Sequence, residues 1–497
     1  MEDQRRVKME KTLESLEPKQ LWEHFYQLNQ IPRCSKNEGK VRDYVVQVAE
    51  RNALPFRVDR VGNVRVEKHA RVGMERKSMA VLQAHLDMVC EKNRDVAHDF
   101  TRDPIKLKRE GDWLMADGTS LGADNGLGVA AALAIMESKD LQHGPLECLF
   151  TVGEETGLTG ASELAGDMLR GRVFLNLDSE EHGTIYIGCS GGKNTELLLA
   201  LKMEAVPSGY KVVRVRVGGL QGGHSGLNIN EGRGNAIKLM ARLLWYTAKQ
   251  FDMRLSVIDG GNKLNAIPRE CEAVAYLPQD KLQGARGTTA AYERIYKEEY
   301  ASSDGGVFVE VDDEGFDKPD WVMDLGSQDR VLSLLHSLPH GVIALSQTIP
   351  GLVETSTNLA MVHAANGRAC IRTSQRSSVE TKLAEIADTV AAAGKLAGAQ
   401  VTQGGGYPGW KPDPDSPTLQ LAKRAFNDLF GEEPKVTAIH AGLECGIIGH
   451  RFPGMDMISF GPTILGAHSP DERVLTPTVK AFWDFLLAIL ENLPGDE

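Results

Sequence analysis

Long apolar segments are missing from this chain of 497 residues. Nowhere do about 18 uncharged apolar residues follow one another, which is the length that a membrane-spanning helix needs. The opening stretch MEDQRRVKMEKTLESLEPKQ is charged from end to end and lacks the apolar core of an export signal. We therefore expect a cytoplasmic protein that has no membrane partner.

Blocks of Lys and Arg are missing as well, and the net charge is -12. A surface that binds nucleic acid or an anionic membrane needs clustered basic residues, so we expect neither partner. Small acidic substrates stay possible, because one local site can be basic. With 42% hydrophobic and 25% charged residues, the chain has the composition of a globular protein with two or three domains.

Cysteine is scarce, and its spacing contains no C-x-x-C pair. An odd number of widely separated cysteines does not indicate a disulfide framework or a zinc ribbon. We expect reduced, mostly buried thiols at Cys34, Cys90, Cys148, Cys189, Cys271, Cys370 and Cys445.

The order of apolar patterns indicates two kinds of domain. Up to about residue 190, near-continuous apolar runs such as MAVLQA and LECLFTV alternate with helical patterns, which is typical of a mostly parallel sheet covered on both faces. From about residue 212, VVRVRVG and ECEAVAYL alternate apolar and polar residues, which predicts an α+β domain whose sheet has one wet face. After the Gly- and Pro-rich stretch 403–417 the α/β pattern returns.

Acids and histidines gather where the predicted strands end or a helix begins: His85, Asp87, Asp124, Glu154, Glu155, Asp178 and His468. The carboxyl ends of parallel strands lie along one edge of a sheet, and α/β proteins bind ligands at that edge. Several carboxylates at one edge repel one another unless a cation lies between them. Imidazole together with carboxylate favours zinc or a similar first-row divalent metal.

Each of these residues also has an ordinary explanation when it is considered alone. The GEETG turn is compatible with a solvated helix N-terminus, and Asp124 with a helix cap. Their coincidence at strand ends favours the metal site. Two phosphate-loop-like stretches do not fit their motifs: GLGVAA follows no strand, and GCSGGKN lacks the required first Gly and the Ser or Thr that would bind magnesium.

A set of motifs extends along nearly the whole chain: HLDMV, GADNGLG, GEETGLTGA, NLDSEE, GGHSG, NAIP, HAGLECG and GPTILGAHSPDE. This set resembles the M20 metallopeptidase family, and within it the aminoacyl-histidine (Xaa-His) dipeptidase branch. The resemblance implies an α/β fold: a zinc-exopeptidase-like catalytic domain with a mostly parallel sheet, interrupted by an α+β lid. It implies catalytic segments 1–191 and 399–497, a lid at 192–398, and a homodimer formed through the lid.

The resemblance also implies a centre of two zinc ions per chain, for which Co²⁺ or Mn²⁺ can substitute. Asp124 would bridge the two ions. His85 and Asp178 would complete one site, and Glu155 and His468 would complete the other. Two such ions, about 3.5 to 4 Å apart, can acidify a water molecule and polarise the scissile carbonyl.

Three further residues are similar to catalytic residues of the family. Asp87 would orient a ligand imidazole and raise its basicity. Glu154 would be the general base for the attacking water and then the acid for the leaving amine. His224 in GGHSG would stabilise the oxyanion, often from the partner subunit of a dimer. Without the resemblance, GGHSG would be interpreted as a glycine-rich turn.

Weaker similarities imply the substrate contacts. Asn265 in LNAIP and Arg372 in ACIRTS are similar to lid residues that bind the carboxyl end of the substrate. Arg368 and Arg376 lie close enough in sequence to take the role of Arg372. Glu444 in HAGLECG is a candidate contact for the substrate amine, and a structural acid is a nearly equal alternative.

We therefore predict a dizinc dipeptidase that hydrolyses unblocked dipeptides, Xaa-His dipeptides such as β-Ala-His among them. An aminoacylase or deacetylase of the same architecture is an alternative, because a metal centre cleaves amides whatever flanks them. A non-catalytic metal-binding homologue is a further alternative. The presence of the predicted base Glu154 beside a full ligand set argues against it.

Overall fold

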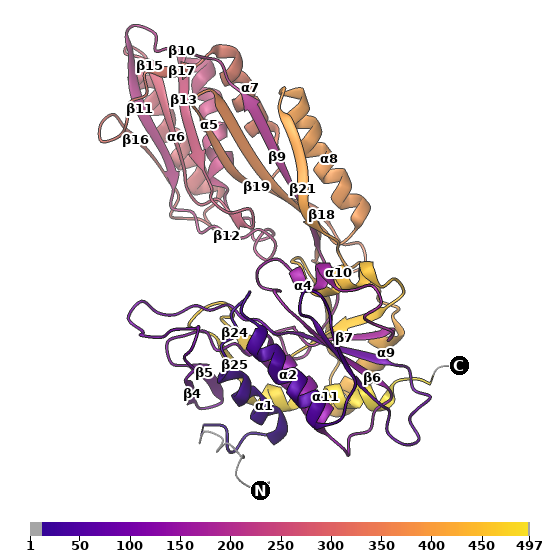
Figure 1. The fold of residues 1–497 in the computed structure, drawn as a ribbon. Helices are drawn as coiled ribbons and strands as arrows, with labels where there is room; N and C mark the ends of the chain where they lie inside the picture. Colours follow the sequence, from indigo (N-terminus) through magenta and orange to yellow (C-terminus); the bar gives the residue numbers. More distant parts are fainter. Residues whose placement is uncertain (1–11, 496–497) are drawn as a thin grey trace. The chain divides into compact units, whose positions relative to one another are not determined.

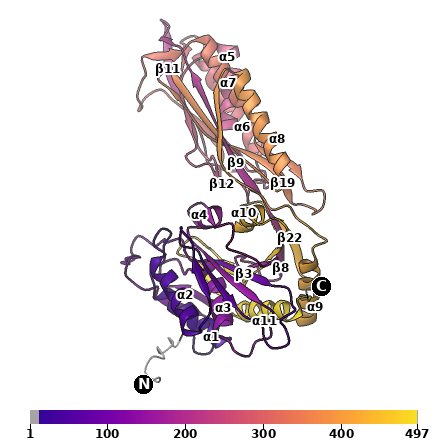
Figure 2. The ribbon, with the colours of Figure 1, turned by 45° about the vertical axis from the view of Figure 1, so that its right-hand side comes forward.

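The computed structural model describes residues 12–495. The charged segment 1–11, which contributes to the expectation that no export signal is present, lies outside the described residues. The chain forms two compact units, and each is described by itself (Figures 1 and 2). The first comprises the residues up to Gly188, Trp410–Ala438 and the residues from Leu443 onward; the second comprises Cys189–Gly409 and Ile439–Gly442.

The second unit covers the predicted insertion 192–398 and extends beyond it. β21 (Gln400–Tyr407) pairs antiparallel with β9 (Gly191–Ala200), so it adds a strand to the sheet of the second unit and moves the boundary to Gly409. The sequence of β21, QVTQGGGY, has few apolar residues and therefore gives little signal for this pairing.

The first unit is built on an eight-stranded sheet in the order β1-β2-β6-β3-β7-β23-β8-β22. In this order the strands are Phe56–Val58, Val64–Lys68, Leu146–Thr151, Ala80–His85, Val173–Asn176, Asp456–Ser459, Thr184–Cys189 and Lys435–Ile439. The central strands β6, β3, β7 and β23 are parallel, whereas the pairings β1–β2, β2–β6 and β23–β8 are antiparallel. The predicted α/β fold is confirmed, with the parallel strands at the centre of a mixed sheet.

The helices of the first unit are α1 (Lys19–Asn29), α2 (Gly39–Arg51), α3 (Ala123–Glu137), α4 (Thr159–Glu163), α9 (Pro417–Phe430), α10 (Glu444–Arg451) and α11 (Thr476–Asn492). Helix α3 is buried from Ala123 to Met136 and packs against β3. Every residue of β3 and of β6 is buried too, as expected for strands covered on both faces. Within residues 12–495, no helix combines the length and the apolar character needed to cross a membrane.

A smaller, four-stranded sheet joins distant segments of the first unit. It contains β24 (Ile464–Leu465), β25 (Arg473–Leu475), β5 (Trp113–Ala116) and β4 (Leu107–Glu110). Because β25 pairs with β5, the segment that follows β23 is held beside the segment that precedes α3. His468 lies between β24 and β25 with a φ of 65°, a left-handed conformation that is uncommon for residues other than glycine.

The second unit has a nine-stranded sheet in the order β16-β11-β15-β13-β19-β20-β9-β21, with β18 paired to β19. Besides β9 and β21, its strands are β11 (Tyr210–Gly218), β13 (Arg254–Gly260), β15 (Cys271–Pro278), β16 (Phe308–Asp312), β18 (Gly341–Leu345), β19 (Val353–Ala365) and β20 (Arg368–Ser377). Buried and half-buried residues alternate along β11, so the predicted period of two is present. Two short pairings complete the strands: β10 (Met203–Ala205) with β17 (Trp321–Met323), and β12 (Gly223–His224) with β14 (Ala266–Ile267).

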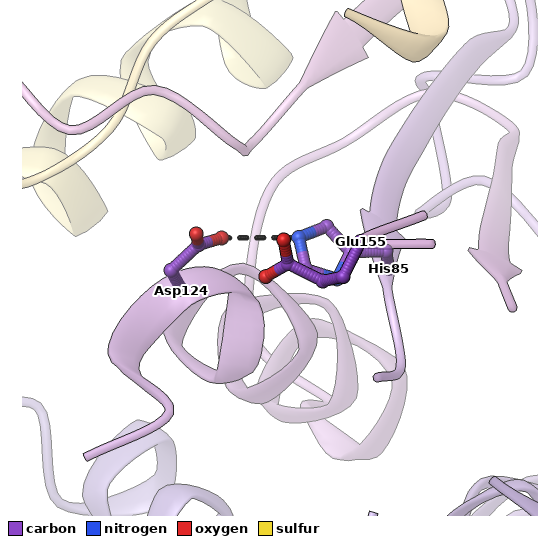
Figure 3. A group of neighbouring side chains, drawn as sticks. All are labelled: His85, Asp124 and Glu155. Carbon is purple, nitrogen blue, oxygen red and sulfur yellow. Dashed lines mark hydrogen bonds and ion pairs between the residues drawn. The ribbon is translucent and has the colours of Figure 1, made fainter. Parts of the chain in front are cut away.

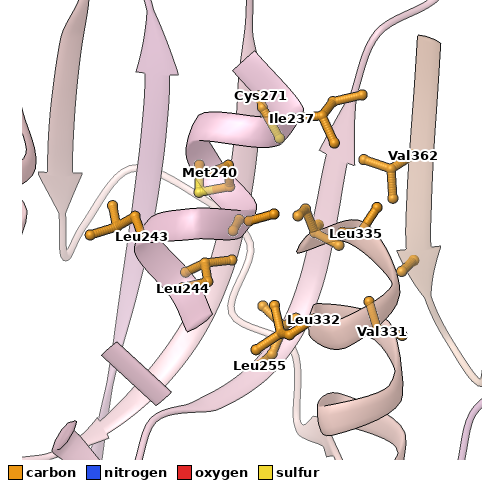
Figure 4. Packing of buried hydrophobic residues seen from close by; sticks show 14 of the residues in the cluster. Ile237, Met240, Leu243, Leu244, Leu255, Cys271, Val331, Leu332, Leu335 and Val362 are labelled. Atoms are coloured by element: carbon orange, nitrogen blue, oxygen red, sulfur yellow. The ribbon is translucent and has the colours of Figure 1, made fainter. Parts of the chain in front are cut away.

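The helices of the second unit are α5 (Ala236–Phe251), α6 (Leu282–Glu299), α7 (Leu325–Ser337) and α8 (Glu380–Leu396). Apolar residues at helical spacing on α5 and α7, such as Ile237, Leu244 and Leu335, are buried against strand residues such as Leu255 (Figure 4). Full burial of one such side chain stabilises a fold by about 1.5–3 kcal/mol. The second unit therefore has a core of its own.

The prediction of seven reduced thiols is wrong for one pair, because Cys34 and Cys90 form a disulfide with a Cα–Cα distance of 5.7 Å. The two cysteines are 56 positions apart in sequence. A parallel bridge between Cys34 and Met88 brings the segment after α1 beside the segment after β3, which sequence spacing alone does not reveal. The other five cysteines are not in disulfides, and four of these five are buried.

Candidate metal centre

The predicted ligands lie where the parallel strands of the first unit end. His85 is the last residue of β3 and lies opposite Thr151, the last residue of β6. Glu155 follows β6, and Asp178 follows β7, so three side chains emerge at the same edge of the sheet. Asp124 is at the start of α3, where its backbone is not yet helical.

Two sets of ligand atoms share Asp124. Nε2 of His85 lies 3.0 Å from Oδ1 of Asp124 and 3.1 Å from Oδ1 of Asp178. Nε2 of His468 lies 3.0 Å from Oδ2 of Asp124 and 3.0 Å from Oε2 of Glu155. Figure 3 shows His85, Asp124 and Glu155 converging on one point. The structure thus brings all five predicted ligands together, with one Asp124 oxygen directed at each histidine.

The five residues fit a divalent metal. One ligand atom from each of His85, Asp124 and Glu155 lies within 4.8 Å of the others. Oε1 of Glu155 is buried and has no hydrogen-bond partner among the described residues, whereas the buried Oδ1 of Asp178 has the contact with Nε2 of His85. Buried carboxylate oxygens without a partner are costly, and a cation would compensate them. A donor set of imidazole and carboxylate suits zinc and similar first-row ions.

A proton and a cation would compete for this centre. Hydrogen bonds to Asp124 and Glu155 raise the pKa of His468 to about 11. Burial raises the pKa of Asp178 to about 6. Because a ligand imidazole must be neutral and a ligand carboxylate ionised, a metal that binds here would displace protons.

Asp87 connects the predicted ligand His85 to the GEETG turn. The carbonyl oxygen of Asp87 lies 3.1 Å from Nδ1 of His85, which fixes the proton on Nδ1 and leaves Nε2 as the ligand atom. The Asp87 carboxylate accepts hydrogen bonds from the backbone N–H groups of Glu154 and Glu155 and from the hydroxyl of Ser35. Burial opposes ionisation of Asp87, but its hydrogen bonds to His85 and these donors lower its pKa to about 2.

Glu154, the predicted base, has a different environment from its neighbour Glu155. Burial raises the pKa of Glu154 well above its ordinary value; the charge of His85 opposes this shift, and the charge of Asp178 adds to it. A carboxyl whose pKa is shifted upward toward neutrality suits general acid and base catalysis.

Glu444 is fully buried at the start of α10. Its Oε2 accepts hydrogen bonds from Nε2 of Gln83 and Oγ1 of Thr151, both at 2.6 Å. Burial raises the pKa of Glu444 to about 7. These contacts tie α10 to the ends of β3 and β6, which is a structural role; a contact with the substrate amine stays a prediction.

The second unit contains His224 and Asn265. Nδ1 of His224 accepts the backbone N–H groups of Gly226 at 3.3 Å and Leu227 at 3.1 Å, so the proton of the neutral ring is on Nε2. Burial and the charge of Arg376 lower the pKa of His224 to about 4, which keeps the ring neutral near pH 7. Asn265 immediately precedes Ala266, the β14 residue that pairs with His224.

Of the three candidate arginines on β20, Arg368 is exposed at the start of the strand, and the other two have opposite environments. Nε of Arg372 forms an ion pair with Oε2 of Glu196 at 2.7 Å, and its side chain is 46% exposed. Arg376 is buried, and it donates a hydrogen bond from Nη1 to the hydroxyl of Tyr407 at 2.9 Å. The charge of Arg376 lowers the pKa of both His224 and His440, so Arg376 is the arginine whose charge acts on the predicted oxyanion donor.

Sequence reasoning missed residues that surround the predicted metal ligands. Glu472 is in the quoted motif GAHSPDE, and it accepts hydrogen bonds from four successive backbone N–H groups, from Leu121 to Asp124. Arg33 is buried and contacts three carbonyl groups near the ligands. The position of Glu472 beside His468 could have drawn attention to it, whereas an isolated Arg in a loop gives no signal.

This fold and site define a metallopeptidase. The model of the family described as Peptidase family M20/M25/M40 matches residues 81–492. The chain therefore belongs to the M20 peptidase family and is a hydrolase of peptide bonds, which confirms the predicted family and enzyme class.

Two dipeptidases are similar to the chain over almost its full length. The chain is 41% identical over 483 residues to the cytosol non-specific dipeptidase of Escherichia coli (strain K12), covering 97% of this chain and 99% of that protein. The crystal structure of aminoacylhistidine dipeptidase from Vibrio alginolyticus has a TM-score of 0.89 at 39% identity, covering 97% of this chain and 98% of that one. A tripeptidase from Staphylococcus aureus, with a TM-score of 0.56 at 15% identity over 96% of this chain and 99% of that one, shares the fold alone.

Proposed function

We propose that the protein is a dizinc dipeptidase that hydrolyses unblocked dipeptides, Xaa-His dipeptides such as β-Ala-His among them. The main support for the metal centre is that Asp124 directs one carboxylate oxygen at His85 and the other at His468. A carboxylate in this position suits a ligand shared by two ions. The dipeptidase activity is supported by the two full-length relatives, one called a non-specific dipeptidase and one an aminoacylhistidine dipeptidase.

The residues divide the chemistry among them. His85, Asp124 and Asp178 would hold one ion, and Asp124, Glu155 and His468 the other. When bound, two divalent ions would supply the Lewis acidity that polarises the scissile carbonyl and acidifies water.

Glu154 would take a proton from the attacking water and pass it to the leaving amine, which requires a carboxyl that is ionised at the start and protonated midway. Its raised pKa supports this role. Asp87 would keep Glu154 in place through its hydrogen bond to the Glu154 backbone and would hold the His85 ring.

His224 would stabilise the oxyanion by donating from Nε2. The tautomer of the ring supports this role. Because both groups that contact Nδ1 are backbone N–H donors, the proton of the neutral ring is on Nε2. If His224 acts in the partner subunit, mixing inactive His224→Ala with inactive Glu154→Gln will restore part of the activity. No recovery after confirmed subunit exchange would place the complete site within one chain.

Arg376 and Asn265 would bind the carboxylate of the substrate. Arg372 stays a candidate from the sequence, but Glu196 already neutralises it on an exposed face. Nε of the buried Arg376 has no hydrogen-bond partner among the described residues, which leaves a donor for a ligand. A buried arginine fork is suited to a planar carboxylate.

A homodimer formed through the second unit is also part of the proposal. Strand β18 pairs with β19 and exposes Val342, Ile343 and Leu345 by 37–56%. An edge strand with exposed apolar side chains favours pairing with another chain. Light scattering will give twice the monomer mass, and Ile343→Lys will shift it toward the monomer. A monomeric wild type would exclude the dimer.

The proposed location is the cytoplasm, which is supported by the name of the E. coli relative, a cytosol dipeptidase. The Cys34–Cys90 disulfide is unusual for a reducing compartment. Alkylation of thiols in freshly quenched cells will show whether the pair is reduced there.

The function is tested with a panel of free dipeptides, dipeptide amides, tripeptides and N-acetyl amino acids, using zinc-loaded or cobalt-loaded protein. We expect free dipeptides, including β-Ala-His, to be cleaved fastest, and Glu154→Gln to be inactive on all of them. N-acetyl amino acids cleaved as fast as dipeptides would favour the aminoacylase alternative. A metal-loaded wild type that cleaves none of them would favour the non-catalytic homologue.

A further inference from the structure

Arg33 is a buried cation beside the candidate metal ligands. The residue is 2% exposed and lies in the segment between α1 and α2. None of the motifs of the family resemblance includes it. A buried guanidinium needs partners for its donors, and the identity of these partners shows what it holds in place.

The first partner is the segment that follows β3. Nη1 of Arg33 donates to the carbonyl oxygens of Leu86 at 3.1 Å and Asp87 at 3.0 Å. The Asp87 carbonyl is the group that also accepts from Nδ1 of His85. Arg33 therefore fixes the carbonyl that sets the tautomer and the ring orientation of one predicted ligand.

The second partner is the segment that precedes α3. Nη2 of Arg33 donates to the carbonyl oxygen of Gly122, two residues before Asp124. The glycines at 122 and 126 leave the room that the guanidinium occupies: a Cβ would lie 2.5 Å from Nη2 at Gly122 and 2.6 Å from it at Gly126. Glu472 holds the same segment as well, because its carboxylate accepts hydrogen bonds from the backbone N–H groups of this segment.

One side chain thus joins the segment of His85 to the segment of Asp124. A lysine could not do this, because its ammonium is a single point of donation, whereas the guanidinium spreads its donors over a rigid fork. The positive charge of Arg33 also interacts with Asp87 in the first segment, with Asp124 in the second and with Glu472. It offsets part of the repulsion among the carboxylates that the metal centre requires.

We propose that Arg33 is a positioning residue of the metal centre, which holds the His85 and Asp124 segments at the separation that the ions require. This inference rests on the proposed metal centre. Residues that orient metal ligands without binding the ion themselves typically contribute roughly 10- to 100-fold to metal affinity or activity.

The test compares Arg33→Lys and Arg33→Met with wild type in a metal-competition titration, which reports affinity and not activity. The absorption spectrum of the Co²⁺-loaded protein reports the geometry of the ligands. Arg65→Lys is the matched control, since Arg65 has a side chain that is 13% exposed, donates to the carbonyl of Met168 and contacts no predicted ligand.

We expect Arg33→Lys to bind metal roughly tenfold more weakly or worse than wild type and to have an altered Co²⁺ spectrum. Arg33→Met should lose more metal affinity than Arg33→Lys. Arg65→Lys will keep the wild-type affinity and spectrum. Folded Arg33→Lys with wild-type affinity and an unchanged spectrum would overturn the proposal.

A second variant covers the case in which both Arg33 variants fail to fold. Gly126→Ala keeps the charge of Arg33 but displaces its Nη2, because the added Cβ would lie 2.6 Å away. Weaker metal binding by this variant supports the positioning role, and unchanged binding refutes it. If wild type itself binds no metal, the proposed function fails instead, so the two failures are distinguishable.

Discussion

Asp87 and Glu154 are joined by a hydrogen bond, in which the backbone N–H of Glu154 donates to Oδ1 of Asp87 at 3.1 Å. The other carboxylate oxygen accepts from the N–H of Glu155 at 3.2 Å. One acid at the end of β3 therefore sets the positions of the predicted base and of a predicted ligand after β6.

Asp87→Asn replaces one of these two acceptor oxygens with an amide that donates. We expect metal affinity and activity to fall by roughly 10- to 100-fold, the usual range for residues that orient metal ligands. Metal titration and steady-state kinetics will measure the two effects. Wild-type values for both would show that the hydrogen bonds to the turn are dispensable.

Glu154→Gln and Glu155→Gln distinguish the two acids of the turn. Glu154→Gln should keep metal and fold but lose at least about a hundredfold in kcat, the scale for loss of a general base. Glu155→Gln should lose metal affinity, because it removes a charged ligand at the His468 side. The metal content of the purified variants will show which acid is the ligand. Loss of metal from Glu154→Gln, with metal retained by Glu155→Gln, would exchange the two assignments.

Metal content of the wild type should be about two ions per chain. Asp124→Ala should weaken both sites because both histidines contact its carboxylate, whereas His468→Ala should mainly weaken one. Elemental analysis after dialysis will count the ions. A fully active wild type with a single bound ion would exclude the dinuclear centre.

Arg376→Met should reduce kcat/KM for free dipeptides by roughly a hundredfold, the cost of about 3 kcal/mol for losing one partner of a buried charged pair. Dipeptide amides should be affected much less, since they lack the carboxylate. Arg372→Met is the matched control on the same strand, and we expect it to keep the preference for a free carboxylate. If Arg372→Met lost that preference and Arg376→Met kept it, Arg372 would be the carboxylate-binding residue.

His440 predicts a dependence of stability on pH. Burial and the charge of Arg376 lower its pKa from 6.5 to about 3. Between these two values the unfolded chain binds a proton that the folded chain does not, so stability increases with pH across this window, by at most about 1.4 kcal/mol per pH unit for one group. Denaturant unfolding of wild type and His440→Gln will measure the difference, and equal slopes would show that His440 titrates normally.

The arrangement of the first unit follows largely from local pattern. Apolar runs of strand length predict β3, β6 and β7, because such runs are stable only when both faces of a sheet are covered. The acids and histidines at their ends then gather at one edge by geometry alone. For this reason His85, Glu155 and Asp178 could be counted among the candidate ligands before the fold was known, and the family resemblance then distinguished them from Asp87 and Glu154.

Other relationships depend on contacts between distant parts of the chain. His468 and Asp124 are 344 positions apart, and the pairing of β25 with β5 brings their segments together. Cys34 meets Cys90 because one segment bridges another, and Arg33 reaches three carbonyls because two glycines leave room for it. Arg372 and Arg376 belong to the same strand and look alike in sequence, but the first pairs with Glu196 at the surface and the second is buried and donates to Tyr407. Sequence alone determines which chemical groups are available and where the strongly apolar strands lie; burial and distance, which decide which groups act together, arise only when remote segments pack.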